Sequence, residues 1–183
     1  SCSRGDSASS LGAGSTGTLT ITGTGAAVRT IRNFLVGQAS VFTQPPNGFV
    51  FGTPGGTTNA FVNVLAGGTL RTEGAIVGNN NATPNGNGSE KANGTVLVDG
   101  VGSQWVVKHN SIDNAATGML LGLNVGGQGS LTISGGSSVL LDATNGLVGA
   151  GDYVNIGQNG GKGALTVTGA GSSMVLARGG AIQ

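Results

Sequence analysis

Residues 129–136, GSLTISGG, decide the fold of this chain, because the same pattern returns as GALTVTGA at residues 163–170. The apolar triplet at its centre has earlier counterparts at 96–98, 62–64 and 19–21, with successive spacings of 34, 35, 34 and 43 residues. A fixed period of this size with Gly-rich joints is typical of solenoids, whose repeats bury a core only by stacking. The sequence therefore predicts a repeat array.

The triplets are predicted to be strands, since Gly, Asn, Ser and Thr dominate and no window has the 3.6-residue period of a helix. Alternation points the first and third residues of each triplet inward and the middle residue outward. We expect an all-β parallel β-helix (β-solenoid) of about five rungs with uncapped ends. Its predicted core stack is Leu19, Ile21, Val62, Val64, Val96, Val98, Leu131, Ile133, Leu165 and Val167.

Two further signals follow each triplet and predict three strands per rung. The second apolar position comes after a Gly or Ser corner and is Val28, Leu70, Trp105, Val139 or Met174. The third signal is an apolar residue before Gly: Val36-Gly37, Val77-Gly78, Val125-Gly126, Ile156-Gly157, and finally the segment 181–183. Segment 147–149 competes with 154–157, and Ile112 competes with 123–126, so rungs of four strands stay an alternative.

The organisation predicted is a Ser/Gly-rich leader at 1–16 and a single solenoid domain at 17–183. Residues 9–12, SSLG, also resemble the third strand of a preceding rung. The two ends of the chain thus fall within the repeat pattern, so the chain is expected to be part of a longer parent chain or to stack end to end with itself. The residues expected at such an end-to-end interface are Leu11, Ala181 and Ile182.

Composition excludes several classes of function. Gly supplies 38 of 183 residues, 4% are aromatic and 8% are charged, with a net charge of +1. The eight basic residues form no patch, which argues against nucleic acid as a partner. The sequence contains no run of 18 apolar residues, so no membrane span is predicted. Cys2 is the only Cys, so no internal disulfide is possible.

Catalytic chemistry is sparse in the sequence, and we expect no enzyme, metal or cofactor site. His109 has no second His or Cys beside it, which favours a surface loop residue over a ligand or base. The strongest form of the hypothesis of a polysaccharide-cleaving enzyme is a site in which Asp99, Asp142 and Asp152 would meet on one side of the stack. The other acids, Asp6, Glu73, Glu90 and Asp113, are scattered. The Gly runs at 126–129 and 160–163 lack the Asp of calcium-binding β-rolls.

The repeats resemble the Gly-rich repeat of autotransporter passenger domains, which also occurs in proteins with PEP-type sorting signals. The resemblance rests on 129–136, 163–172, Val101-Gly102-Ser103-Gln104-Trp105 and Leu123-Asn124-Val125-Gly126, and it extends over most of 17–183. It implies a secreted β-helical stalk with an extracellular or cell-surface role such as adhesion. The long insertion at 38–59 and the single Trp depart from the family pattern and bear on loop functions.

The function expected is therefore structural: a surface adhesin passenger or the subunit of a head-to-tail filament. The alternative is a carbohydrate-binding or polysaccharide-cleaving β-helix. Partners expected are the chain itself, a longer parent chain, or a host-surface or matrix ligand recognised by the loops at 38–59 and 79–93. Arg4-Gly5-Asp6 matches an integrin-binding tripeptide, although such a short match in a Ser-rich leader arises easily by chance.

Overall fold

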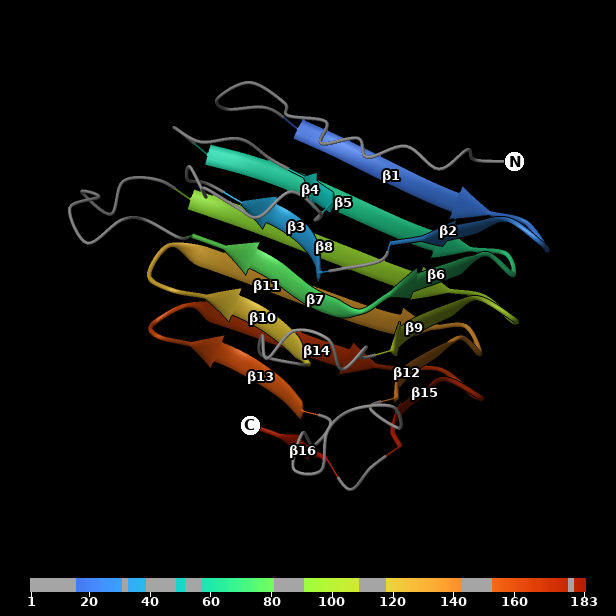
Figure 1. Cartoon of the computed structure of the whole chain (residues 1–183). Coiled ribbons are helices and arrows are strands. Elements are labelled where there is room, and N and C mark those ends of the chain that lie inside the picture. Colours follow the sequence, from blue (N-terminus) through green and yellow to red (C-terminus); the bar gives the residue numbers. More distant parts are fainter. Residues whose placement is uncertain are drawn as a thin grey trace.

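The chain folds into three parallel β-sheets that wrap around a common core (Figure 1). The computed structural model describes residues 16–30, 33–38, 49–51, 57–80, 91–108, 118–142, 153–177 and 180–183. Within these ranges the regular structure is entirely β-strand. The prediction of an all-β parallel β-helix of about five rungs is confirmed.

Each sheet collects one strand from every rung. Sheet A contains β1 (Thr16–Thr22), β5 (Thr57–Leu65), β8 (Lys91–Asp99), β11 (Gly127–Ser134) and β14 (Lys162–Val167). Sheet B contains β2 (Ala27–Arg29), β6 (Thr69–Thr72), β9 (Gln104–Lys108), β12 (Ser138–Asp142) and β15 (Ser173–Leu176). Sheet C contains β3 (Asn33–Gln38), β7 (Gly74–Asn79), β10 (Met119–Leu123), β13 (Tyr153–Gln158) and β16 (Ala181–Ile182), with β4 (Phe49–Phe51) added beside β3.

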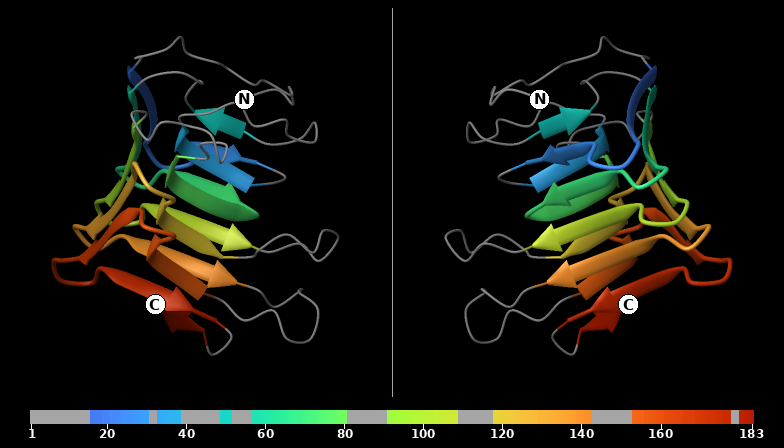
Figure 2. Two further views of the ribbon diagram at one scale, coloured as in Figure 1. Left: turned by 90° about the vertical axis from the view of Figure 1, so that its left-hand side faces the viewer. Right: turned by 90° about the vertical axis from the view of Figure 1, so that its right-hand side faces the viewer.

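The chain passes through sheets A, B and C in turn, so β1, β2 and β3 form rung 1 and β14, β15 and β16 form rung 5. The side views show these rungs stacked in chain order from the N-terminal to the C-terminal end (Figure 2). Because equivalent strands of successive rungs run in the same direction, all of the strand pairs are parallel, as in β1 with β5 and β12 with β15.

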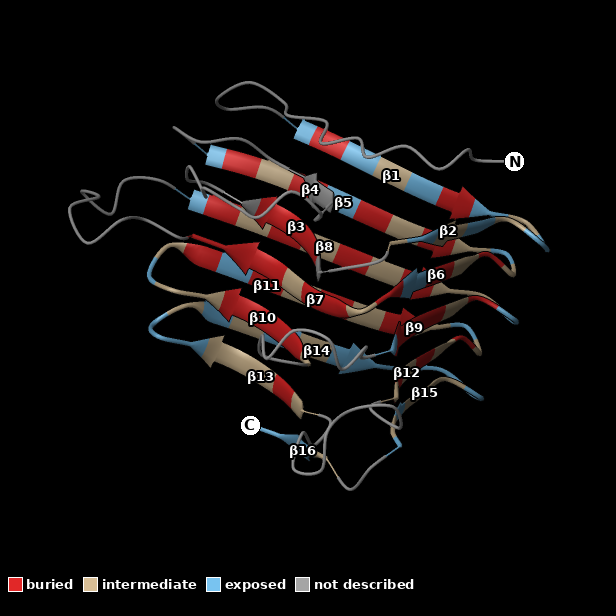
Figure 3. Ribbon diagram, viewed as in Figure 1, coloured by how far each residue is buried: buried red, intermediate tan, exposed pale blue. Residues whose placement is uncertain are grey.

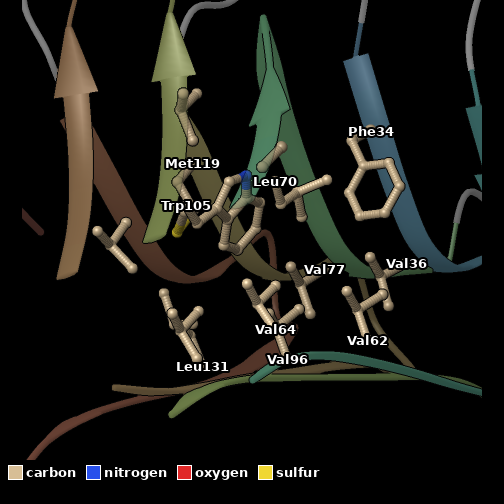
Figure 4. Close-up of a cluster of buried hydrophobic side chains, with 14 of the residues drawn as sticks. Phe34, Val36, Val62, Val64, Leu70, Val77, Val96, Trp105, Met119 and Leu131 are labelled. Atoms are coloured by element: carbon tan, nitrogen blue, oxygen red, sulfur yellow. The ribbon is translucent and has the colours of Figure 1, made fainter. Parts of the chain in front are cut away.

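Side chains at equivalent positions form continuous rows inside the stack (Figure 4). In sheet A one row is Leu19, Val62, Val96, Leu131 and Leu165, and the next is Ile21, Val64, Val98, Ile133 and Val167. In sheet B the row is Val28, Leu70, Trp105, Val139 and Met174. Sheet C contributes the row Phe34, Ala75, Met119, Val154 and Ile182. The spacing in the sequence thus gives the register of the second apolar position correctly.

The third strand of rung 3 lies earlier than the sequence pattern predicts. Leu121, not Val125, pairs with Val77 on one side and Ile156 on the other. Val125 lies in the following turn with 64% of its surface exposed, after Asn124 at φ 65°. The prediction of Val125-Gly126 is therefore wrong, whereas Ile156-Gly157 is confirmed as part of β13. Residues 112 and 147–149 lie outside the described residues.

Glycine explains this placement, because the position that follows Val77 in rung 2 and Leu121 in rung 3 requires a residue without a Cβ. Gly78 and Gly122 have φ of 73° and 74°, and a Cβ on either would lie 2.0 Å from a carbonyl oxygen of sheet A, that of Gln128 or Lys162. Sheets A and C thus touch backbone to backbone at this corner. Gly122 occupies this row in rung 3, so Leu121 is the inward residue before it.

Strand β4 is a feature that the repeat pattern does not indicate. It pairs with β3 on the edge opposite β7, so sheet C has six strands and sheets A and B have five. Of the described strands, none adds to the outer edges of β1, β2, β14 and β15, as expected for uncapped ends. Sheet C at the N-terminal end departs from that expectation, because β4 takes the edge that the strand predicted at residues 9–12 would occupy.

Candidate functional site

Serine hydroxyls hold the corner between sheets A and B. The Ser103 hydroxyl donates to the Asp99 carbonyl oxygen at 2.6 Å and accepts from the Gly67 N–H of the preceding rung at 3.0 Å. Ser137 donates to the Val98 carbonyl oxygen at 2.7 Å across rungs. The Gly136 N–H donates to the Ser172 hydroxyl at 3.0 Å. These hydroxyls join neighbouring rungs, and Ser103 and Ser137 are buried, so their role here is structural.

Asparagine amides perform the same role at the corner between sheets C and A. The amide nitrogen of Asn159 donates to the Asn124 side-chain oxygen at 3.3 Å, and that of Asn80 donates to the Val125 carbonyl oxygen at 2.7 Å. Within sheet A, Asn93 donates to the Asn59 side-chain oxygen at 2.9 Å. Much of the polar chemistry of the rungs is therefore used to connect each repeat to the next.

The described acidic residues do not gather into a site. Asp99 ends β8 at the corner between sheets A and B, where the Ser134 hydroxyl donates to its carboxylate at 2.6 Å. Asp142 ends β12 at the far side of sheet B, with its carboxylate 3.3 Å from the Lys108 ammonium. Asp6, Glu90, His109, Asp113 and Asp152 lie outside the described residues. Among the residues that are described, no three His, Cys, Asp or Glu side chains lie close enough to hold a metal ion.

The phenol of Tyr153 has a raised pKa. Burial raises the pKa of its phenol above the ordinary value. The ring packs over Gly118, where an added Cβ would lie 2.8 Å from a ring carbon. Desolvation favours the neutral phenol, so the shift is an effect of packing.

The outer face of sheet A is flat and nearly uncharged. Its central row is Thr20, Asn63, Leu97, Thr132 and Thr166. The row beside it contains Phe61, exposed by 38%, and the pair Ser130 and Thr95, whose hydroxyls lie 3.3 Å apart. The Thr row is interrupted at Asn63 and Leu97, so it does not form the regular hydroxyl array of an ice-binding solenoid.

The outer face of sheet B brings two arginines together. Arg29 and Arg71 are in register on β2 and β6, and both are exposed. The same outer row continues through Val106, Leu140 and Val175. Like charges directly opposite one another destabilise a sheet pair slightly. This alignment follows from the register of Val28 and Leu70, the residues directly before the two arginines, which the repeat pattern predicts.

The predicted core and interface residues fall in three environments. Ile21, Val62, Val64, Val96, Val98, Leu131 and Ile133 are buried. Leu19 and Leu165 are partly buried against the core, and Val167 is 45% exposed. Ala181 and Ile182 form β16 at the C-terminal end, where Ile182 is 53% exposed, and Leu11 lies outside the described residues. Burial therefore falls toward rung 5 (Figure 3).

The segments expected to carry recognition begin and end within strands. Gln38 belongs to β3 and Asn59 to β5, while Asn79 belongs to β7 and Asn93 to β8. The connecting residues 39–48, 52–56 and 81–90 lie outside the described residues. Strand β4 lies within the first of these connections.

Comparisons with protein-family models, curated proteins and solved structures gave no significant match. A search of the described residues for a helix long and apolar enough to cross a membrane also found none.

Proposed function

We propose that this chain is an extracellular structural β-solenoid, the stalk of a surface adhesin passenger, which presents its corner insertions to a ligand. The observation that carries the proposal is the difference between corners. Between sheets A and B every connection has three to five residues. The connections after β9 and β12 have ten residues each, and that from β7 to β8 has 11. Repeat proteins commonly bind their ligands through loops of variable length that are attached to repeats of constant structure.

The use of polar groups within the rungs supports a structural role. Ser103, Ser137 and Asn124 take part in hydrogen bonds between rungs, and Asp99 and Asp142 each have a local partner. The interior is apolar, apart from buried groups such as the paired Thr72 hydroxyl. A stack of this kind resists local opening, because each inner rung is hydrogen-bonded on both sides. Stiffness is the property that a stalk needs.

The test is to remove an insertion while the rungs are kept. Asn124-Val125-Gly126 links Leu123 to Gly127, and these positions are in register with Asn79 and Ala92. Residues 80–91 are therefore replaced by these three residues. A second graft replaces residues 108–117 by a single Glu, since Glu73 alone links the equivalent positions Thr72 and Gly74 in rung 2.

Binding of the parent chain and both grafts is measured on immobilised matrix proteins and neutral polysaccharides. We expect the parent to bind one of these surfaces and at least one graft to lose the binding, with the far-UV circular dichroism unchanged. Equal binding by parent and both grafts would instead favour the sheet faces, and thus the carbohydrate-binding alternative. That outcome is checked with Phe61→Ala on the outer face of sheet A.

A head-to-tail filament is the second candidate function. It is favoured by the exposed apolar side chains of rung 5, Val167 at 45% and Ile182 at 53%, whose counterparts Ile133 and Val154 in rung 4 are fully buried. Electron microscopy over a concentration series tests it. Fibres would support the filament, and discrete particles at every concentration would leave the adhesin stalk.

A further inference from the structure

The first rung does not end in the same way in its three sheets. In sheets A and B the outermost described strands are β1 and β2. The inward residues Leu19 of β1 and Val28 of β2 are only partly buried, whereas Ile21 of β1 is 4% exposed. In sheet C, β4 lies outside β3, with Phe49 opposite Phe34, Val50 opposite Leu35 and Phe51 opposite Val36 (Figure 1). The chain therefore adds β4, parallel to β3, on the N-terminal side of sheet C before it continues into rung 2.

Burial shows that this edge is closed. Phe34 and Val36 belong to the first rung, yet both have 0% of their surface exposed. Leu35, the residue between them on the outer side of the sheet, is 3% exposed. At the opposite end of the stack, β14 and β16 are the edge strands of sheets A and C among the described strands. There Val167 and Ile182 are about half exposed. An uncovered end strand leaves at least some of its inward side chains accessible, as Leu19 and Val28 show, and in β3 neither Phe34 nor Val36 is accessible.

We propose that β4 is a built-in cap, which prevents the edge of sheet C at β3 from pairing with a strand of a second copy of this chain. Uncovered strand edges are templates for pairing, and proteins protect them with short edge strands or covering segments. The six-residue strand β3 would be a good template, whereas β4 has three residues. The insertion at 39–56 is thereby assigned an assembly-limiting role in place of recognition. This inference depends on the fold; it is independent of the adhesin stalk and argues against the head-to-tail filament.

The cap also places sheet C out of step with the other two sheets. A second copy that continued the stack would join β14 to β1 in sheet A and β15 to β2 in sheet B. In sheet C the same addition would bring β16 to β4, one strand before rung 1. The added copy would then have to shift by one rung between sheets, which loses hydrogen bonds in at least one of them. Removing β4 removes this mismatch.

The test compares two grafts that use the same three residues. Gln38 and Thr58 are in register with Asn79 and Ala92, and hence with Leu123 and Gly127. Residues 39–57 are replaced by Asn-Val-Gly in the first graft, which deletes β4. The matched control is the graft at residues 80–91, which shortens the equivalent corner of rung 2 and keeps β4. Val50→Pro is the point variant, because proline has no N–H to donate to a strand partner.

Sedimentation velocity over a concentration series and hydrogen exchange of the peptide covering 33–38 are the two measurements. Without β4 we expect the chain to form dimers and larger species, and at concentrations too low for association its β3 amides to exchange about tenfold faster. Val50→Pro is expected to change both in the same direction, which keeps the test valid if the 39–57 graft fails to fold. The control graft should match the parent. Faster exchange without self-association would overturn the cap, and so would unchanged exchange in Val50→Pro and the 39–57 graft.

Discussion

The indole N–H of Trp105 donates a hydrogen bond to the hydroxyl oxygen of Thr72 at 3.1 Å, between rungs 3 and 2 and inside the core. Trp105 is fully buried and its ring meets that of Phe34 edge to face, with centroids 6.4 Å apart and planes at 79°. A single contact region therefore connects the first three rungs through sheets B and C. Trp105 is the only Trp of the chain, so its fluorescence reports this region alone.

Replacing Thr72 by Val should destabilise the stack by leaving the indole N–H without a partner. A buried donor that loses its acceptor costs about 1–3 kcal/mol. The free energy of unfolding is measured in urea, with Trp105 fluorescence as the signal. Thr72→Ser keeps the hydroxyl and is expected to lose less stability than Thr72→Val; the reverse order would show that packing of the Thr methyl matters more than the hydrogen bond.

The sequence predicts the rows of sheets A and B well because their signals are local. Each triplet is followed by a short corner of nearly constant length, so the position of Trp105 relative to Leu70 and Val139 can be counted from the chain. The connections into sheet C vary in length, and there the count fails. Gly122 could have been found by asking which Gly has an apolar residue before it and an Asn two residues after it, as Gly157 does.

The feature that bears on assembly could not be predicted in the same way. Strand β4 lies outside the repeat period. It pairs in parallel with β3, the strand before it in the chain, and lies on the N-terminal side of that strand. No spacing rule gives that direction, since a repeat array normally adds each strand on the C-terminal side. The alignment of Arg29 with Arg71, by contrast, follows from the predicted equivalence of Val28 and Leu70, the residues directly before them. Strand β4 alone is a product of tertiary structure.

Gly78→Ala should prevent folding, or leave a severely destabilised chain. Gly78 has φ 73°, and a Cβ there would lie 2.0 Å from the Gln128 carbonyl oxygen, where backbone meets backbone. The matched control is Gly23→Ala, because Gly23 has φ 97° and nothing within 4 Å of a Cβ. The control should lose only about 1–2 kcal/mol, the cost of a left-handed conformation. Circular dichroism melting of the two variants makes the comparison, and equal losses would argue against close packing of sheets A and C.

Leucines in one row of sheet A should differ in importance according to their rung. Leu131 is 1% exposed in rung 4, and Leu131→Ala should cost about 2–5 kcal/mol, while Leu131→Asp should not fold. Leu165 follows it in the row but is only partly buried. Leu165→Ala should therefore cost clearly less. Urea unfolding followed by circular dichroism gives both values, and a soluble, folded Leu131→Asp chain would refute the inward assignment of this row.

Arg71→Glu should stabilise the sheet B edge by converting a like-charge neighbour of Arg29 into an opposite charge. Cross-strand pairs of this kind contribute about 0.2–1 kcal/mol. Arg71→Gln, which removes the repulsion without adding an attraction, should fall between the parent and Arg71→Glu. Thermal melts at low and high salt are the measurement, and the difference should shrink at high salt because the pair is exposed. A gain that is independent of salt would point to a cause other than charge.

Tyr153 should make the folded state sensitive to alkaline pH. Burial raises the pKa of its phenol in the folded chain, so the unfolded chain releases the proton first as the pH rises through about 10. Stability is then fully retained below that pH and falls as the pH rises from there toward the folded-state pKa. Tyr153 is the only Tyr, so its ultraviolet absorbance gives this titration directly in native and urea-unfolded chain. Tyr153→Phe should remove this part of the alkaline loss; a variant that loses stability as steeply as the parent above pH of about 10 would show that Tyr153 is not the cause.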